Sequence, residues 1–181
     1  MEMLRELCAK AAAAELEFVV IGGHAVNSYG VGRQTADLDL LVRDTDADKW
    51  KTLLRGLSYT IRSEQAAFIQ FEPPASHQWP VDLVLVDERT FTGVFEAGKT
   101  AQFSEGAHAR VPSVEHLIAL KLHALKQVGI LRELVDVPDI VALVEVTKID
   151  YTSVEFKTLS LRYGDEAIYE QIVEHCRRRG L

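Results

Sequence analysis

The spacing of hydrophobic residues changes along the chain, from short apolar runs before residue 113 to helical periodicity after it. A short apolar run is typical of a buried strand, whereas apolar residues at intervals of three and four predict an amphipathic helix. The first part of the chain is therefore expected to contain both kinds of element. The expected helices are 3–16, 24–30 and 46–57. The expected strands are 18–21, 37–42, 59–62, 66–71 and 81–86. Residues 73–80 are expected to form a loop, and 99–111 a hairpin that turns at Glu105 and Gly106.

Each of the four helices expected after residue 112 is marked by a residue that commonly starts a helix. These residues are Ser113 for a helix to about 128, Pro138 in a first turn, Thr152 in a capping box with Glu155, and Asp165 for a helix to Arg179. Strands with helices first, then helices alone, indicate an α/β (α+β) fold. We expect a mixed sheet of three to five strands flanked by helices in residues 1–112, and a helical C-terminal part in 113–181 packed on this core as a single compact unit.

Composition and charge exclude several classes of protein. A chain of 181 residues with 48% hydrophobic and 26% charged residues is typical of a globular domain rather than a disordered segment. No apolar run approaches the roughly 20 residues of a membrane span, and the start of the chain lacks the pattern of a signal peptide. We therefore expect a cytoplasmic protein with no membrane contact. A net charge of −7 argues against broad nucleic-acid binding, which relies on many basic side chains facing phosphates.

Three aspartates lie in or next to strands that otherwise read as buried core. Asp37 and Asp39 are two residues apart, so the period of a strand places both carboxylates on the same side. Asp82 is a third carboxylate within the apolar run 81–86. Like charges at close range need a cation, and carboxylate oxygens suit Mg²⁺, or Mn²⁺ in its place. The alternative is that all three are strand-end charges that face solvent.

Two consecutive glycines, Gly22 and Gly23, stand between an expected strand and an expected helix. Glycines at such a junction let the backbone approach a ligand closely, and the N–H groups of a helix start favour an anion. A Gly-Gly pair alone is also compatible with a simple tight turn. Arg33 and Thr35 precede the first aspartates and would contact phosphate or orient the carboxylates, although Arg33 reads equally well as a solvated loop charge.

Lys121 occupies an unusual position on its expected helix. At about 100° per residue it falls in the middle of the apolar face. That face is made of Val114, Leu117, Ile118, Leu125 and Val128. An ammonium group there needs an anion or a route to water, so Lys121 either faces a phosphate, pairs with an aspartate, or extends to the edge of the core.

These residues together resemble the nucleotidyltransferase superfamily of DNA polymerase β. Its pattern is a hydrophobic residue, two small residues, nine to thirteen further residues, Asp-hydrophobic-Asp, and a later acidic residue on another strand. The matching residues are Ile21-Gly22-Gly23, Asp37-Leu38-Asp39 and Asp82, with thirteen residues between Gly23 and Asp37. Residues 22–42 look more narrowly like the AbiEii-type, toxin-related branch, and residues 117–122 with Asp136 and Asp139 match its later motifs.

The resemblance implies a metal-dependent enzyme that moves a nucleoside monophosphate from a nucleoside triphosphate to an acceptor hydroxyl. The acceptor would be an RNA end, a protein side chain or a small molecule. In the family's two-metal mechanism the three aspartates hold Mg²⁺ and are catalytic. The implied nucleotide-binding residues are Gly22, Gly23, Arg33, Thr35, Lys121 and Asp136. Asn27, Tyr29 and Trp79 are candidates for the pocket wall. His24 follows the glycines and would be placed to touch a nucleotide, although a lone histidine is more often a helix-start or core residue. The branch also implies a toxin–antitoxin or phage-defence role and a cognate antitoxin.

Two other functions are compatible with parts of this pattern. A non-catalytic module of the same fold would bind a nucleotide or a partner protein, as an antitoxin does, but it would not need all three carboxylates. A glycosyltransferase would use Asp-x-Asp to hold a nucleotide sugar. The upstream Gly-Gly spacing and the short chain argue against that class.

Overall fold

The computed structural model describes residues 2–181, apart from the side chains of Glu2, Val128, Ile130 and Leu131. The expected place of Val128 on the apolar helix face therefore lies outside the described residues. Contacts along the chain define two compact units. The first runs to Ser28 and resumes from Gly32 to Ser113, and the second comprises Tyr29–Val31 and Val114–Leu181. Each unit is described separately below.

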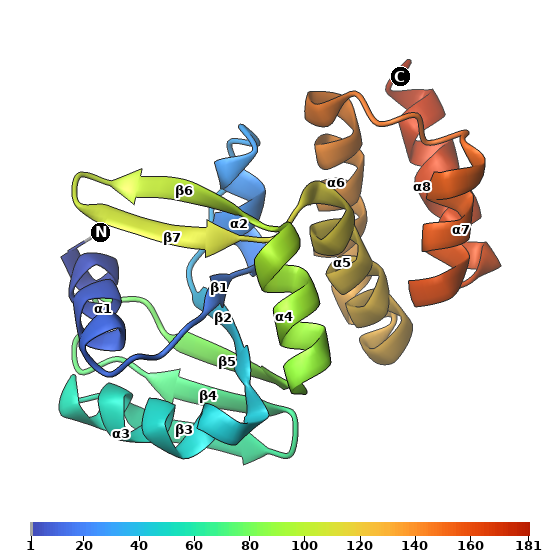
Figure 1. Ribbon diagram of the computed structural model, residues 1–181. Coiled ribbons are helices and arrows are strands. Elements are labelled where there is room, and N and C mark those ends of the chain that lie inside the picture. The colour runs from blue at the N-terminus through green and yellow to red at the C-terminus, as the bar shows by residue number, and fades with distance from the viewer. Residues whose placement is uncertain (1) are drawn as a thin grey trace. The chain divides into compact units, whose positions relative to one another are not determined.

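The first unit is built on one mixed sheet of seven strands, in the order β3-β4-β5-β2-β1-β7-β6 (Figure 1). The strands are β1 (Val19–Val20), β2 (Leu38–Arg43), β3 (Thr60–Gln65), β4 (Phe68–Glu72), β5 (Val81–Val86), β6 (Lys99–Ser104) and β7 (Ala107–Val111). The pairs β2–β5 and β1–β7 are parallel, and the other neighbours are antiparallel. The α/β fold class is confirmed. The expected size of three to five strands is wrong, because the 99–111 hairpin joins the sheet through a pairing of β7 with the two-residue strand β1.

Strand β2 forms the middle of this sheet. Leu38, Leu40, Leu41 and Val42 are all fully buried. Consecutive buried residues mean that both faces of the strand are covered, as in the central strands of α/β proteins. Asp39 is therefore a half-buried carboxylate within a strand whose apolar residues are all fully buried.

The helices of the first unit are α1 (Glu2–Ala13), α2 (Gly22–Ser28), the 3₁₀ turn η1 (Asp44–Asp46), α3 (Ala47–Gly56) and α4 (Glu88–Ala97). Helix α1 ends before the expected residue 16, because the chain turns at Glu15 with φ of 54°. Helix α2 already includes both glycines. Helix α4 was not predicted from the hydrophobic pattern. It starts at the cap residue Asp87, which accepts a hydrogen bond from the Thr90 N–H (2.7 Å).

The second unit consists of four helices: α5 (Val114–Val128), α6 (Ile130–Thr147), α7 (Val154–Tyr163) and α8 (Glu166–Arg178). Helices α5 and α8 begin where Ser113 and Asp165 predict. Pro138 lies inside α6 and not in its first turn, so that prediction is wrong. Gly129, with φ of 67°, separates α5 from α6 and lets α6 begin eight residues earlier than Pro138. Buried neighbours such as Val137 and Ile140 hold the helix together around the missing N–H.

The start of α7 also differs from the prediction. Ser153 is its cap and accepts a hydrogen bond from the Phe156 N–H (3.1 Å). Thr152 instead donates its hydroxyl to Asp150 (2.6 Å) in the preceding turn. The capping box of Thr152 with Glu155 is therefore wrong by one residue. Asp150 accepts hydrogen bonds from both the hydroxyl and the backbone N–H of Thr152, so Thr152 belongs to the preceding turn.

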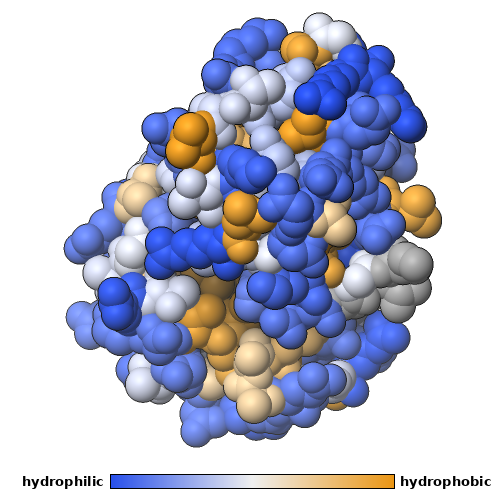
Figure 2. Space-filling model, turned by 90° about the vertical axis from the view of Figure 1, so that its right-hand side faces the viewer, coloured by the Kyte–Doolittle hydropathy of each residue, from blue (hydrophilic) through white to orange (hydrophobic). Residues whose placement is uncertain are grey.

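None of the helices in residues 2–181 is both long enough and apolar enough to cross a membrane. On the face that Figure 2 shows, hydrophobic residues reach the surface in small groups with hydrophilic side chains between them. This distribution is ordinary for a folded protein, since apolar atoms always contribute part of its surface.

Candidate active site

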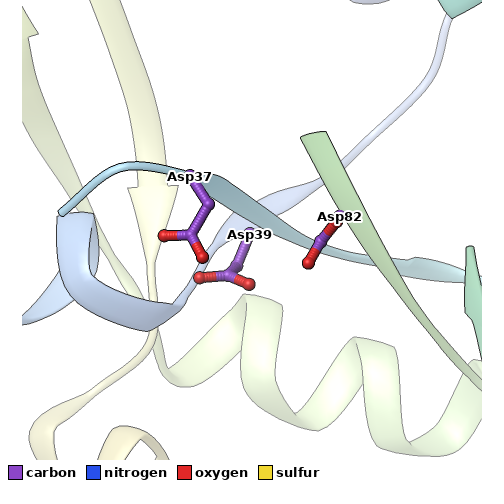
Figure 3. A group of neighbouring side chains, drawn as sticks. All are labelled: Asp37, Asp39 and Asp82. Atoms are coloured by element: carbon purple, nitrogen blue, oxygen red, sulfur yellow. The ribbon is translucent and has the colours of Figure 1, made fainter. Parts of the chain in front are cut away.

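The parallel pairing of β2 with β5 brings the three aspartates together. Asp39 and Asp82 are direct neighbours in the register of these strands, and Asp37 lies just before β2. One carboxylate oxygen from each residue lies within 4.8 Å of those of the other two, and all three side chains are half-buried (Figure 3). The convergence of the three carboxylates, which the strand pattern suggested, is thus present in the structure.

The oxygen atoms of these carboxylates fit a divalent cation. Three negative groups at this spacing repel one another unless a positive charge lies among them. Hard oxygen donors that are partly open to solvent suit Mg²⁺ or Mn²⁺, which keep positions free for water and phosphate. No sulfur or imidazole ligand belongs to the cluster. The donor set therefore matches the ion that the sequence predicts.

Gly22 is needed where the chain passes this cluster. Its φ is +60°, and a Cβ atom added to it would lie 1.8 Å from Oδ2 of Asp39. The Ile21 N–H donates to the Asp39 carbonyl (3.0 Å), which ties the start of α2 to β2. A side chain at position 22 would therefore displace the carboxylate.

Gly23 makes room for a different part of the site. A Cβ atom here would lie 2.6 Å from a guanidinium nitrogen of Arg33 and 2.6 Å from the Thr35 hydroxyl. The two glycines thus face different neighbours, Gly22 a metal-ligand candidate and Gly23 the segment that precedes it. A simple tight turn does not require this space. Both glycines are therefore needed for the packing of the site and not only for a change of chain direction.

Two hydrogen bonds orient the outer carboxylates. Thr35 donates its hydroxyl to Oδ1 of Asp37 (3.0 Å). Gln70, the register partner of Asp82 on β4, donates its amide to Oδ2 of Asp82 (3.3 Å). Of the two roles considered for Thr35, the structure shows the orienting one. Gln70 was not predicted as a site residue, although it is the only amide in the alternating strand 68–72.

Asn27 holds the segment that carries Arg33. Its side-chain amide donates to the Arg33 carbonyl (2.8 Å), and its oxygen accepts from the Arg33 N–H (3.0 Å). Arg33 itself is half-buried. Arg33 is therefore not a fully solvated loop charge. The paired hydrogen bonds place its guanidinium beside Gly23 and next to a cavity.

Two cavities flank the carboxylates within the first unit. The Trp79 cavity, of about 400 Å³, is lined by His24, Asn27, Ser28, Arg33, Thr35, Trp79, Gln102 and Phe103. The Asp82 cavity, of about 420 Å³, is lined by Ala36, Asp37, Arg62, Gln70, Phe71, Glu72, Pro73, Pro80 and Asp82. Thr35 belongs to the first wall and Asp37 to the second. Their hydrogen bond therefore joins the two cavities at the site.

Lys121 lies in the second unit, in a buried ion cluster. Its ammonium donates to Oδ1 of Asp136 (2.8 Å) and to Oδ2 of Asp139 (2.7 Å). The three residues are 5%, 1% and 4% exposed. The aspartate-paired interpretation of Lys121 is thus confirmed, and an extension of its side chain to solvent is excluded. A nucleotide contact by Lys121 or Asp136 stays a prediction.

No protein-family model matches the chain, and no curated protein matches it. Similar folds occur among solved structures. The antibiotic-resistance factor ANT(2'')-Ia superposes with a TM-score of 0.67 at 14% identity, over 98% of this chain and 96% of that one. A nucleotidyltransferase-like antigenic protein of Paracoccidioides brasiliensis has a TM-score of 0.58 at 17% identity (87% and 84% covered). The lincosamide antibiotic adenylyltransferase LnuA, in a lincomycin-bound structure, has 0.58 at 12% identity (81% and 97% covered). The chain therefore has the nucleotidyltransferase fold.

Proposed function

We propose that the protein is a metal-dependent nucleotidyltransferase that moves a nucleoside monophosphate from a nucleoside triphosphate to an acceptor hydroxyl. The observation that carries this proposal is the cluster of three carboxylates, whose oxygens lie within 4.8 Å of one another beside Gly22. A structural role alone does not account for three like charges held at this distance. The shared fold with nucleotidyltransferases supports the same activity.

Asp37, Asp39 and Asp82 would hold Mg²⁺ or Mn²⁺. When bound, such an ion neutralises charge on the phosphates and lowers the pKa of a coordinated hydroxyl. Thr35 and Gln70 keep the outer carboxylates in place through their hydrogen bonds. Arg33, fixed by Asn27, has its guanidinium beside Gly23 and lines the same cavity as Thr35, and it would contact the triphosphate.

The acceptor would occupy the Asp82 cavity. Its hydroxyl oxygen forms a bond to the α-phosphorus, the bond from that phosphorus to the pyrophosphate oxygen breaks, and the hydroxyl proton passes to Asp82. Asp82 is suited to this because it lines the cavity and its carboxylate stays half-exposed. Arg62 and Glu72 on the same wall offer charges of both signs to a polar acceptor.

The comparisons and the resemblance favour different acceptors. ANT(2'')-Ia and LnuA are antibiotic-modifying or antibiotic-resistance proteins, which supports a small molecule. The AbiEii-type resemblance adds an RNA end or a protein side chain, a cognate antitoxin as partner, and a toxin–antitoxin or phage-defence setting. All of these acceptors present a hydroxyl, so the same residues serve each case.

Transfer from α-³²P-labelled nucleoside triphosphates tests the proposal. The protein is incubated with Mg²⁺ or Mn²⁺ and with RNA, protein, aminoglycoside or lincosamide acceptors, and both the labelled product and pyrophosphate are measured. We expect Asp82→Asn to lower the rate by at least about a hundredfold, because the proton acceptor and a metal ligand are lost together. Asp48→Asn changes a carboxylate that is 94% exposed and should leave the rate unchanged.

An absence of pyrophosphate release with every nucleotide, cation and acceptor combination would contradict the proposed activity. An Asp82→Asn protein that retains metal-dependent transfer would contradict the role of Asp82 in the reaction, but not the activity itself. Self-labelling of the chain would support the proposal and identify the protein itself as an acceptor.

A further inference from the structure

One residue that lines the Trp79 cavity, His24, has a buried polar atom that the described residues leave unsatisfied. His24 is 8% exposed, and its Nε2 has no hydrogen-bond partner among residues 2–181. A buried nitrogen without a partner is destabilising compared with one that is hydrogen-bonded. Burial also lowers the pKa of His24, against the opposing effect of Asp37, so the ring is neutral near pH 7. A ligand with a complementary polar atom would satisfy this nitrogen.

Aromatic rings make up much of the same wall. The ring centroids of His24 and Trp79 are 4.3 Å apart, and those of His24 and Phe103 are 6.4 Å apart. Rings presented together in this way suit a flat, aromatic ligand, because every nucleobase has a face that stacks on an aromatic side chain. Ser28 and Gln102 add a hydroxyl and an amide to the wall.

The position of the cavity relates it to the donor nucleotide. Arg33, which would contact the triphosphate, lines it together with Thr35, and Thr35 is hydrogen-bonded to Asp37. Its volume of about 400 Å³ lies within the roughly 300–1,000 Å³ of small-molecule sites. Asp82 lines the other cavity, so the acceptor side of the site is already assigned.

We propose that the Trp79 cavity binds the nucleobase of the donor nucleoside triphosphate, stacked on Trp79 and Phe103 and hydrogen-bonded to Nε2 of His24. This inference rests on the proposed function and names the residues that select the donor. His24 and Trp79 are binding residues that touch the base and take no part in the transfer of the phosphoryl group.

Binding without turnover tests the inference. Affinities are measured by calorimetry with Mg²⁺ and the α,β-methylene analogues of the four ribonucleoside triphosphates, and with inorganic tripolyphosphate as a probe that lacks a base. For the tightest analogue, His24→Ala and Trp79→Ala should each raise Kd about tenfold or more, the usual effect of losing one stacking or buried polar contact. The Kd of tripolyphosphate should be unchanged. His77→Ala, an exposed residue of the same loop outside the cavity wall, is the matched control.

A second measurement uses the unsubstituted chain, so it does not depend on the folding of the variants. An azido-base derivative of the tightest nucleotide is photolysed on the protein, and the labelled peptides are identified by mass spectrometry. Label on the peptides that contain Trp79 or Phe103 supports the inference. Label confined to any other part of the chain overturns it.

The outcomes separate this inference from the proposed function. If nucleotidyl transfer occurs while His24→Ala and Trp79→Ala keep the original Kd, the base lies elsewhere and only the inference is overturned. If base-dependent binding occurs without transfer to any acceptor, the inference stands and the proposed activity fails. If neither the analogues nor tripolyphosphate bind, both are wrong.

Discussion

Gly22 shows how much of the site depends on a single missing side chain. Gly22→Ala should lower transfer at least about tenfold and destabilise the protein by about 1–2 kcal/mol, because its φ is +60° and the new methyl group would meet Asp39. The measurements are the transfer rate and the thermal unfolding midpoint. Gly56→Ala, in helix α3 with nothing within 4 Å of its Cβ position, is the control and should reduce neither. An active and equally stable Gly22→Ala protein would contradict the assignment.

The three carboxylates of the site could be predicted from the sequence, whereas the roles of the residues that hold them in place could not. Asp37 and Asp39 are predictable because a strand has a period of two, and Asp82 because it interrupts an apolar run. Gln70 became identifiable only when the register of β4 on β5 was known. Asn27 was suspected of lining a pocket, but its hydrogen bonds to the Arg33 backbone depend on a close approach that no local pattern encodes.

At the scale of single elements, helix α4 was missed because its composition is unfavourable. Thr90, Thr92 and Gly93 have low helix propensity and hide the spacing of the buried residues Phe91 and Val94. The usable signal was Asp87, which reads equally well as a turn residue but is the helix cap. Packing of α4 against β2 overrides the weak local preference.

Helix α6 places Asp136 and Asp139 on one face, where both meet Lys121 of helix α5. Lys121→Met should destabilise the protein by about 3–5 kcal/mol, because two buried carboxylates would lose the ammonium group that donates to both. Urea unfolding followed by far-ultraviolet circular dichroism measures the effect. Lys126→Met, an exposed position on the same helix, should change stability by no more than about 0.5 kcal/mol.

A triple variant separates charge from packing in this cluster. Lys121→Met with Asp136→Asn and Asp139→Asn removes all three charges and should recover much of the lost stability, since no unpaired carboxylate remains. If Lys121→Met unfolds at the same urea concentration as Lys126→Met, the ion cluster does not stabilise the helical unit.

At the scale of the whole molecule, a bound cation and folding should be linked. Mg²⁺ should raise the unfolding midpoint of the unsubstituted protein, with about 2.7 kcal/mol of stabilisation at a hundred times Kd. Asp39→Asn should remove this response and, without Mg²⁺, should be more stable than the unsubstituted protein because one repelling charge is gone. Calorimetric unfolding with Mg²⁺ and with a chelator measures both effects. An unchanged response to Mg²⁺ in Asp39→Asn would place the cation elsewhere.

The fold class was predictable from the order of strands and helices, but the extent of the sheet was not. Each strand of the 99–111 hairpin was expected, yet its attachment depends on one parallel pairing, between Val19 and Arg110, that is distant in sequence. Periodicity describes which face of a strand is buried and does not say which strands are neighbours. The same reason explains why both cavities were found only in the structure.

The Leu38 N–H donates to the Pro80 carbonyl (2.9 Å), directly before β5 begins its pairing with β2. This bond fixes the start of β5 after the Pro-containing loop. Insertions or deletions at residues 74–78 would therefore change the loop but leave the position of Asp82 unchanged. Trp79 and Pro73, at the two ends of that segment, belong to different cavity walls. Variation in one short surface loop could therefore diversify what the protein recognises while the reactive centre is inherited intact.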